Sequence, residues 1–259
     1  MFHLFQTHEK RQDEDKTANV EEDFSDITYI AEYFESLSGI TFHKQLSILE
    51  SKTKTFCRLR NIYSYDELLQ QVQCDKELRQ EFIDHLTTNE TFFYREFNQI
   101  EELVRCVKGD GGVVRILCAP CASGEESYSI VIALLEAGVS ADMFHILGID
   151  INKDAIQRAQ RAAYRGRSVE NLSEDLKKRY FLHKEERYHL KEGIKKLVDF
   201  KVINIFDKEF LALGTFDYIF CRNMLIYFDY ATKQRAKEIL QTMLKDDAKK
   251  IFFGHADLL

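Results

Sequence analysis

The spacing of hydrophobic positions divides the chain into a helical part and a part in which strands and helices alternate. Over residues 24–86 apolar residues recur every three or four positions, as at Ile27, Ile30 and Phe34. This is the period of an amphipathic helix. The pattern predicts an all-α domain of four or five short helices over 24–86, followed by a linking segment over 87–109.

From residue 110 onward, short β-branched and aromatic runs alternate with helical patterns. The runs that predict strands are Val113–Leu117, Phe144–Ile149, Leu197–Ile203, Phe216–Cys221 and Lys250–Phe253. The segments that predict helices are Glu126–Ala137, Lys153–Ala163 and Tyr230–Leu244. This order predicts βαβ units over 110–259, and therefore an α/β fold with a parallel sheet covered by helices on both faces.

The stretch between the second predicted helix and the third predicted strand is too long for a plain loop. Residues 173–200 contain the charged, tyrosine-bearing segment Ser173–Lys196, which has short alternating runs. We expect a small insert of two or three β-strands there.

Composition and charge narrow the class of protein. The 259 residues are 45% hydrophobic, with no apolar run long enough to span a membrane and no apolar core of a secretory signal at the N-terminus. We therefore expect a cytoplasmic protein that does not insert into membranes. The net charge of −7 disfavours nucleic acid as a partner. Ten charges in residues 9–23 predict that 1–23 is a disordered tail.

Six cysteines are scattered among apolar neighbours, as expected for reduced thiols. Cys118 and Cys121 form a Cys-x-x-Cys pair, the spacing of some metal and redox sites. No second pair or histidine pair follows at zinc spacing, so we expect no metal.

The junction after the first predicted strand indicates a ligand with a positive charge. The stretch Cys118–Ser129 contains one glycine, Gly124, and lacks the Gly-x-Gly-x-x-Gly of dinucleotide sites. Glu125 and Glu126 stand where a phosphate would lie, and they would repel it and attract an ammonium or sulfonium group. The plainer interpretation is that acidic residues favour the start of any helix.

Polar residues follow the other predicted strands. Asp150 ends the second strand, where an acidic residue takes ribose hydroxyls in such folds. A plainer role for Asp150 is capping the next helix, although Asn152 can also fill it. Asn204 suits the adenine edge, and Arg222 and Asn223 emerge at the end of the fourth strand. A phosphate-free nucleoside with a cation describes S-adenosyl-L-methionine.

Three ordered blocks carry a resemblance to a known family. They are Leu86–Glu96, the Gly-Glu-Glu-x-Tyr-Ser turn within Cys121–Ser129, and Phe216–Phe228 with its Phe-Cys-Arg-Asn-x-x-Ile-Tyr-Phe. Over residues 24–259 the chain resembles the CheR family, the chemotaxis receptor methyltransferases that use S-adenosyl-L-methionine for protein-glutamate O-methylation. The resemblance implies a Rossmann-like class I methyltransferase sheet with an all-α N-terminal domain and a small β insert. It also implies two further strands, which would follow Leu259.

The resemblance also implies which residues meet the cofactor. Arg95 would face its carboxylate, Glu126 (or, as a second choice, Glu125) its ammonium, and Asp150 its ribose. The cofactor-binding residues that it implies are Asn89, Thr91, Arg95, Glu126, Asp150, Asn204, Ile205, Arg222 and Asn223.

The implied reaction yields glutamate methyl esters and S-adenosyl-L-homocysteine. Arg222 and Tyr227 would handle the incoming glutamate as the catalytic residues, although Tyr227 could simply pack in the core. The implied partners are cytoplasmic helices of methyl-accepting chemotaxis receptors, on which we expect the protein to act as a monomer. Residues 44–60 carry a net charge of +4, which suits docking on acidic helices but also suits a solvated helix face.

Two rival functions remain at this point. A methyltransferase of nucleobases or small molecules usually has an Asn/Asp-Pro-Pro-aromatic turn after the fourth strand, where this chain has Arg-Asn-Met-Leu over 222–225. A non-catalytic binding module would not need Arg95, Glu126, Asp150 and Arg222. Titration with the cofactor and a methylation assay separate these rivals.

Overall fold

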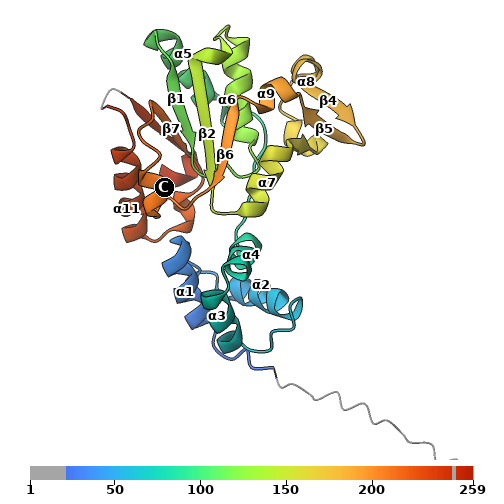
Figure 1. Cartoon of the computed structure of the whole chain (residues 1–259), viewed down its shortest axis with the longest axis vertical. Coiled ribbons are helices and arrows are strands. Elements are labelled where there is room, and N and C mark those ends of the chain that lie inside the picture. The colour runs from blue at the N-terminus through green and yellow to red at the C-terminus, as the bar shows by residue number, and fades with distance from the viewer. Residues whose placement is uncertain (1–21, 247–248, 259) are drawn as a thin grey trace, which may run out of the picture.

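In the computed structural model, which describes residues 22–246 and 249–258, a domain of helices lies below a domain built on a sheet (Figure 1). The helices of the all-α domain are α1 (Thr28–Ser38), α2 (Leu46–Arg58), α3 (Tyr65–Cys74) and α4 (Lys76–Leu86). Their apolar faces form one core, with Ile30, Phe34 and Phe82 fully buried. The predicted all-α character of this domain is confirmed. Most of the tail predicted over 1–23 lies outside the described residues.

Side chains cap the later helices of this domain. Ser64 Oγ accepts a hydrogen bond from the backbone of Glu67 at the start of α3, and Asp75 caps α4 in the same way. Short helices gain much of their stability from such caps and from packing. The caps therefore fix where α4 begins, and α4 is the helix that meets the second domain.

The second domain contains a five-stranded parallel sheet, as predicted. Its strands are β1 (Val114–Cys118), β2 (Phe144–Asp150), β6 (Val198–Val202), β7 (Tyr218–Cys221) and β8 (Lys250–Phe253), in the order β6-β2-β1-β7-β8. The chain builds outward from β1 to one edge through β2 and β6, and then to the other edge through β7 and β8. The strand order therefore reverses between β1 and β7, where open α/β sheets form their ligand crevice.

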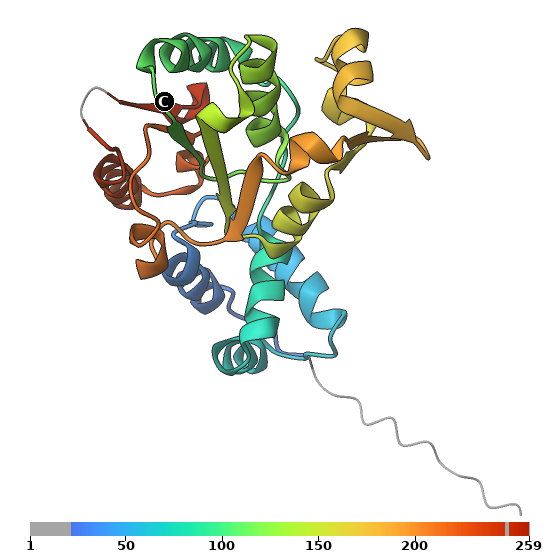
Figure 2. The same cartoon turned by 45° about the horizontal axis from the view of Figure 1, so that its top comes forward.

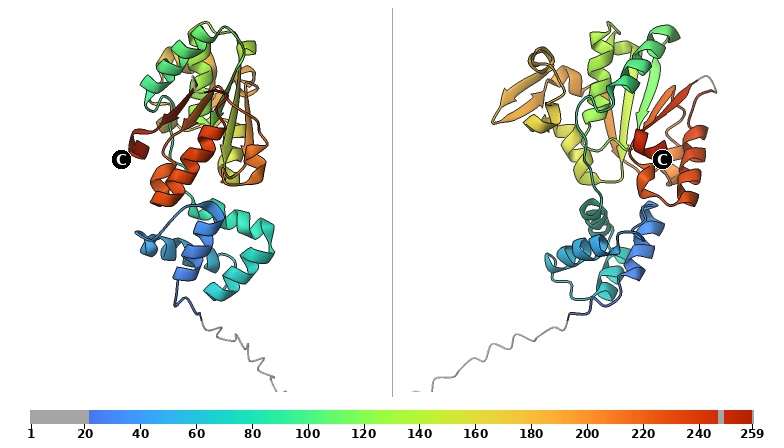
Figure 3. Two further views of the ribbon diagram at one scale, coloured as in Figure 1. Left: turned by 90° about the vertical axis from the view of Figure 1, so that its left-hand side faces the viewer. Right: turned by 180° about the vertical axis from the view of Figure 1, so that it is seen from behind.

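Helices cover both faces of the sheet (Figure 3). On one face lie α5 (Phe97–Asp110), α6 (Glu125–Glu136) and α7 (Lys153–Arg161), and on the other lie α10 (Lys208–Leu211) and α11 (Tyr230–Thr242). Neighbouring strand residues alternate between the two cores: Ile116 packs with the first set and Leu117 with the second. Burial on both faces explains why β7 is apolar throughout, whereas the edge strand β6 carries the exposed Asp199 and Lys201.

Helix α5 corrects the prediction of a linker over 87–109. Only residues 87–96 connect the domains without regular helix or strand, and Phe97–Asp110 is a helix that packs on the sheet. Ile100, Leu103 and Val107 are its buried residues, and their spacing is helical. The signal was present in the sequence.

The predicted β insert is a three-stranded antiparallel sheet, but its composition differs from the prediction. The segment contains β4 (Phe181–Lys184) and β5 (Arg187–Leu190) between α8 (Glu174–Tyr180) and α9 (Glu192–Lys195). The third strand is β3 (Ala163–Tyr164), which precedes the predicted segment and pairs with β5. Helix α7 ends at Arg161, so Ala163 is free to join this sheet rather than the helix. Short 3-10 helices complete the chain at Ala141–Met143, Gly166–Val169, Leu225–Tyr227 and His255–Leu258.

Hydrogen bonds join the two domains where α4 meets α7 (Figure 2). Asp84 Oδ1 accepts from the backbone of Lys153 at 2.7 Å, and Gln80 Nε2 donates to the carbonyl of Ile151 at 2.8 Å. The helical domain is thereby held over the carboxyl end of β2. None of the described helices is long and apolar enough to cross a membrane.

Candidate active site

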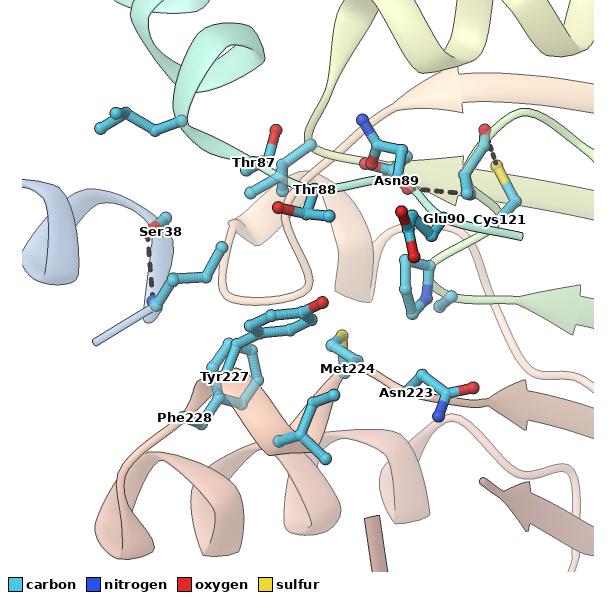
Figure 4. Close-up of a pocket in the computed structure, with 18 of the residues that line it drawn as sticks. Ser38, Thr87, Thr88, Asn89, Glu90, Cys121, Asn223, Met224, Tyr227 and Phe228 are labelled. Carbon is cyan, nitrogen blue, oxygen red and sulfur yellow. Dashed lines mark hydrogen bonds between the residues drawn. The ribbon is translucent and has the colours of Figure 1, made fainter. Parts of the chain in front are cut away.

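A cavity of about 380 Å³ lies between the helical domain and the carboxyl ends of the strands. Figure 4 shows Thr88, Asn89 and Glu90 of the linker on one side of it and Asn223, Met224 and Tyr227 on the other. The second-choice residue Glu125 lines a neighbouring cavity instead. The other site residues that the resemblance implied all line this one cavity; they are Asn89, Thr91, Arg95, Glu126, Asp150, Asn204, Ile205, Arg222, Asn223 and Tyr227.

The turn between β1 and α6 brings its backbone close to β2. Gly124 has a φ of 88°, and a Cβ there would lie 2.9 Å from Ala159 Cβ, so both conformation and space require glycine. The backbone N–H of Ala122 donates to Asp150 Oδ2 at 2.9 Å. The glycine and this bond place the first turn of α6, and with it Glu126, at the cavity wall.

A buried ion pair crosses the crevice. Arg222 Nη1 lies 2.8 Å from Glu126 Oε2, and the side chains are 2% and 13% exposed. The second carboxylate near this arginine is Glu96, with Oε2 3.6 Å from Nη2. Burial raises the pKa of the Glu126 carboxyl, and the Arg222 charge opposes that rise. The pair limits the cost of placing charges where water is excluded.

Several polar atoms of this pair lack hydrogen-bond partners. Glu126 Oε1, Arg222 Nε and Arg222 Nη1 are buried and make no hydrogen bond, because the contact between Nη1 and Glu126 is not aligned as one. A buried polar group without a partner costs about 1–3 kcal/mol. A ligand bearing an ammonium and a carboxylate could supply partners for such atoms, so the donor set fits the methionine end of S-adenosyl-L-methionine.

Asp150 is buried at the end of β2, and its carboxylate already accepts two backbone hydrogen bonds. Oδ1 accepts from Asn152 at 2.9 Å and Oδ2 from Ala122. Burial raises its pKa to about 6. The cap of α7 is Asn152, whose side chain accepts from Ala155, so capping does not account for Asp150. Each carboxylate oxygen retains a lone pair that a hydroxyl could use.

Asn204 bonds to the protein through its side chain. Nδ2 donates to the carbonyl of Leu37 on α1 at 3.0 Å, and Oδ1 accepts from Phe206. These bonds tie the end of β6 to the helical domain. The adjacent Ile205 is buried and lines the cavity, so it offers an apolar surface for a flat ring.

The linker supplies Arg95 to the cavity. Its Nη1 makes a long hydrogen bond, 3.3 Å, to the carbonyl of Glu90, and its guanidinium lies over Phe92. No carboxylate among the described residues lies within ion-pair distance, so its remaining donors can serve an anionic ligand. Its own carbonyl accepts from Arg222 Nη2 at 2.7 Å, which connects the linker to the buried pair.

Tyr227 is 39% exposed and lines the cavity, so it is not a core residue. Partial burial raises the pKa of its phenol, which therefore stays protonated at neutral pH. Its carbonyl accepts from Thr41 N at 2.9 Å, which ties it to the helical domain.

Glu96 and Asp257 belong to the site although no sequence pattern pointed to them. The Asp257 carboxylate is buried and accepts backbone hydrogen bonds from Asn223, Ile226 and Gly254. It therefore holds the loop that carries Arg222 and Tyr227. Glu96 adopts a left-handed φ of 47°, which only a minority of residues other than glycine do.

The cysteines of the Cys-x-x-Cys pair are buried. Burial raises the pKa of both the Cys118 and the Cys121 thiols well above the usual value, so they are neutral packing groups at physiological pH.

Comparison with known proteins identifies relatives of both domains. Residues 89–259 match the family model described as CheR methyltransferase, SAM binding domain, and residues 25–87 match CheR methyltransferase, all-alpha domain. The chemotaxis protein methyltransferase of Campylobacter jejuni (strain 81-176) is 37% identical over 224 residues, which cover 86% of this chain and 84% of that protein. Chemotaxis protein methyltransferase 2 of Vibrio cholerae is 37% identical over 71% of this chain and 67% of its own length. The chemotaxis protein methyltransferase of Escherichia coli is 32% identical over 69% and 64%.

Proposed function

The chain belongs to the CheR methyltransferase family, and from this premise we propose that it transfers the methyl group of S-adenosyl-L-methionine to glutamate side-chain carboxylates of methyl-accepting chemotaxis proteins. The products are glutamate methyl esters, which serve receptor adaptation, and S-adenosyl-L-homocysteine. The observation that carries the proposal is the buried Arg222–Glu126 pair, with its unpartnered polar atoms, in a cavity that Asp150 also lines.

We assign the cofactor-binding roles as follows. Glu126 Oε1 takes the ammonium, Arg95 takes the carboxylate and Asp150 takes the ribose hydroxyls. Ile205 and the backbone of Asn204 border the adenine, because the side chain of Asn204 is bonded to Leu37 and Phe206. When bound, the cofactor supplies a methyl group on a positively charged sulfur.

The residues of the chain need to orient the acceptor rather than activate it. A free glutamate carboxyl has a pKa of about 4.3, so it is already an ionised nucleophile at pH 7 and needs no general base. Arg222 holds one oxygen of the acceptor carboxylate and leaves the other free to attack. Tyr227, protonated at neutral pH, can donate a hydrogen bond that fixes the side chain.

Water exclusion favours this reaction, because opposite charges are neutralised during transfer and a dry site stabilises them less than water does. The closed geometry supports this: Arg222 is 2% exposed, and the linker and the helical domain both cover the strand ends. If Arg222 bound the acceptor carboxylate too tightly, it would stabilise the ground state and slow the reaction. Because Arg222 also interacts with the carboxylates of Glu126 and Glu96, it binds the acceptor carboxylate less tightly.

The test combines titration with transfer. Isothermal titration should show one site for S-adenosyl-L-homocysteine, and methyl-tritiated S-adenosyl-L-methionine should label a cytoplasmic receptor fragment. Binding without labelling would favour the non-catalytic module, and labelling of nucleic acid or small molecules instead would favour the other rival. The cytoplasmic location and the monomeric state stay predictions.

A further inference from the structure

A second, more open cavity of about 890 Å³ adjoins the first. It lies between the linker, the start of α7 and the base of the small antiparallel sheet. Both cavities are lined by Lys52, by residues 87–91 and by Arg95. The linker therefore forms a shared wall, and a molecule that reaches into the first cavity over this wall also meets the second.

Four exposed arginines from three segments line this second cavity: Arg158, Arg165, Arg167 and Arg187. Within 22–246 and 249–258, none of them has a carboxylate within 4.0 Å. Among the described residues, the one hydrogen bond that the Arg187 side chain makes is to the carbonyl of Ala163, at 3.5 Å. Their guanidinium donors are therefore free to bind a partner. We call this surface the arginine groove.

Carboxylates also line the groove, but two of them are already engaged. Asp84 Oδ1 accepts from Lys153 N and Gln80 Nε2. Glu125 is buried and accepts from Ser123 Oγ, and burial raises its pKa to about 7, so it is partly neutral at physiological pH. Glu90, Asp154 and Glu170 are exposed, and none of them forms an ion pair with the four arginines.

The basic segment of the helical domain is a weaker candidate for an acidic partner than the sequence suggested. Lys54 pairs with Glu50, Arg58 with Glu22 and Arg60 with Glu81. Glu22 and Glu81 lie outside residues 44–60, and counting them halves the net charge of +4 to +2. Lys52 Nζ donates to the carbonyl of Leu86, in the cavity wall rather than on the outer face.

We propose that the arginine groove binds acidic side chains that flank the target glutamate on a helix of the substrate protein. The proposal rests on the proposed function. Residues three or four positions apart on a helix lie about 5–6 Å from each other, so neighbours of a glutamate that enters the first cavity stay close to the shared wall. A guanidinium binds a carboxylate through two parallel hydrogen bonds, which orients the helix as well as attracting it.

The test measures binding without turnover. The probe is a fluorescein-labelled helical peptide of repeated Ala-Glu-Glu-Ala units, titrated by fluorescence anisotropy with the full-length protein in the presence of S-adenosyl-L-homocysteine. The double variant R165Q/R167Q should bind about tenfold more weakly than the wild type. R165K/R167K should lie between them, because lysine keeps the charge but loses the paired donors.

Two charge-matched variants separate the groove from general electrostatics. R105Q/K108Q removes two exposed charges on α5 that line neither cavity, and its affinity should stay within twofold of the wild type. K44Q/R58Q should also have a smaller effect than R165Q/R167Q. The proposal is overturned if the wild type does not bind the peptide, if all double variants lose affinity equally, if K44Q/R58Q loses more, or if an oligonucleotide of equal charge binds as tightly.

Methyl transfer to a receptor fragment distinguishes this proposal from the proposed function. If the wild type binds the peptide through the groove but esterifies no glutamate, the proposed function fails and the groove stands. If R165Q/R167Q esterifies the fragment with an unchanged KM, the groove proposal fails and the proposed function stands.

Discussion

Arg222 Nη1 and Glu126 Oε2 lie 2.8 Å apart and join the end of β7 to the first turn of α6. The two residues come from opposite sides of the point where the strand order reverses. Each neutralises the charge of the other at a buried position, and each keeps polar atoms without hydrogen-bond partners. A charged ligand that bound beside this buried pair would supply the hydrogen-bond partners that these atoms lack.

The first prediction concerns Glu126→Gln, which keeps the shape of the side chain and removes its charge. Affinity for S-adenosyl-L-homocysteine should fall about ten- to hundredfold, because a hydrogen bond to a charged group contributes about 1.5–3 kcal/mol. Isothermal titration measures it. The matched control is Glu125→Gln, whose side chain lines the arginine groove, and its affinity should change less than threefold. Equal losses in both variants would contradict the assignment of the ammonium to Glu126.

The second prediction concerns Asp150→Asn. The variant loses one backbone hydrogen bond, which lowers the free energy of unfolding. It also removes the cost of burying a carboxylate whose pKa is about 6, which raises the free energy of unfolding by a similar amount. The melting temperature should therefore change little, while affinity for S-adenosyl-L-homocysteine falls about ten- to hundredfold. A large drop in melting temperature with unchanged affinity would make Asp150 structural only.

The same residue predicts a pH dependence. The folded pKa of about 6 lies above the unfolded value of about 3.9, so the native state binds more protons between these values. The contribution of Asp150 to stability therefore rises as the pH falls from 6 to 4. Cofactor affinity moves the opposite way, since ribose hydroxyls need the ionised acceptor, and should fall about tenfold per pH unit below 6. Asp150→Asn should lack this part of the pH profile.

The third prediction concerns Arg222→Lys. Replacing Arg222 by alanine would leave Glu126 buried without a positive partner, which costs about 3–5 kcal/mol and obscures any effect on catalysis. Lysine keeps the charge but lacks the rigid planar set of donors that orients the acceptor carboxylate. The variant should fold and bind S-adenosyl-L-homocysteine within about threefold of the wild type, while kcat falls about a hundredfold. Unchanged kcat with a raised KM for the cofactor would assign Arg222 to the cofactor alone.

The fourth prediction concerns Asp257, which holds the loop of Arg222 and Tyr227. Asp257→Ala leaves the backbone N–H groups of Asn223 and Gly254 without an acceptor and should lower kcat at least tenfold. Asp257→Asn retains an acceptor oxygen and should recover most of the activity. Thermal unfolding gives the fraction of each variant that is folded at the assay temperature. If kcat per folded molecule equals that of the wild type in both variants, the positioning role is wrong.

The sequence alone predicts those parts of the structure that depend on the local pattern of apolar and polar residues. Strands β1, β2, β6, β7 and β8 were predicted within about two residues of their bounds, because each is a short run rich in β-branched and aromatic residues. Asp150, Asn204, Arg222 and Asn223 were predicted to lie together because the carboxyl ends of parallel strands converge. Asn89, Thr91, Arg95, Ile205 and Tyr227 were implied only by the resemblance to the CheR family. Helix α5 carried an equally local signal that the interpretation as a linker overlooked.

What could not be predicted depends on contacts between distant residues. Nothing near Asp257 in sequence shows that its carboxylate accepts from Asn223, and Glu96 becomes part of the site only when the linker folds against Arg222. The strand β3 requires a partner, β5, more than twenty residues later. The ion pairs that Glu22 and Glu81 make with Arg58 and Arg60 likewise join separate segments.

The measurement that tests the central claim most directly is the alkali lability of the transferred methyl group. The protein is incubated with methyl-tritiated S-adenosyl-L-methionine and a cytoplasmic receptor fragment, and volatile tritiated methanol is measured after mild base. We predict that nearly all protein-bound label is released as methanol, and that a fragment with its methylation-site glutamates changed to glutamine takes up none. Label that resists base, or equal labelling of the glutamine fragment, would contradict the claim that this cavity esterifies glutamate carboxylates.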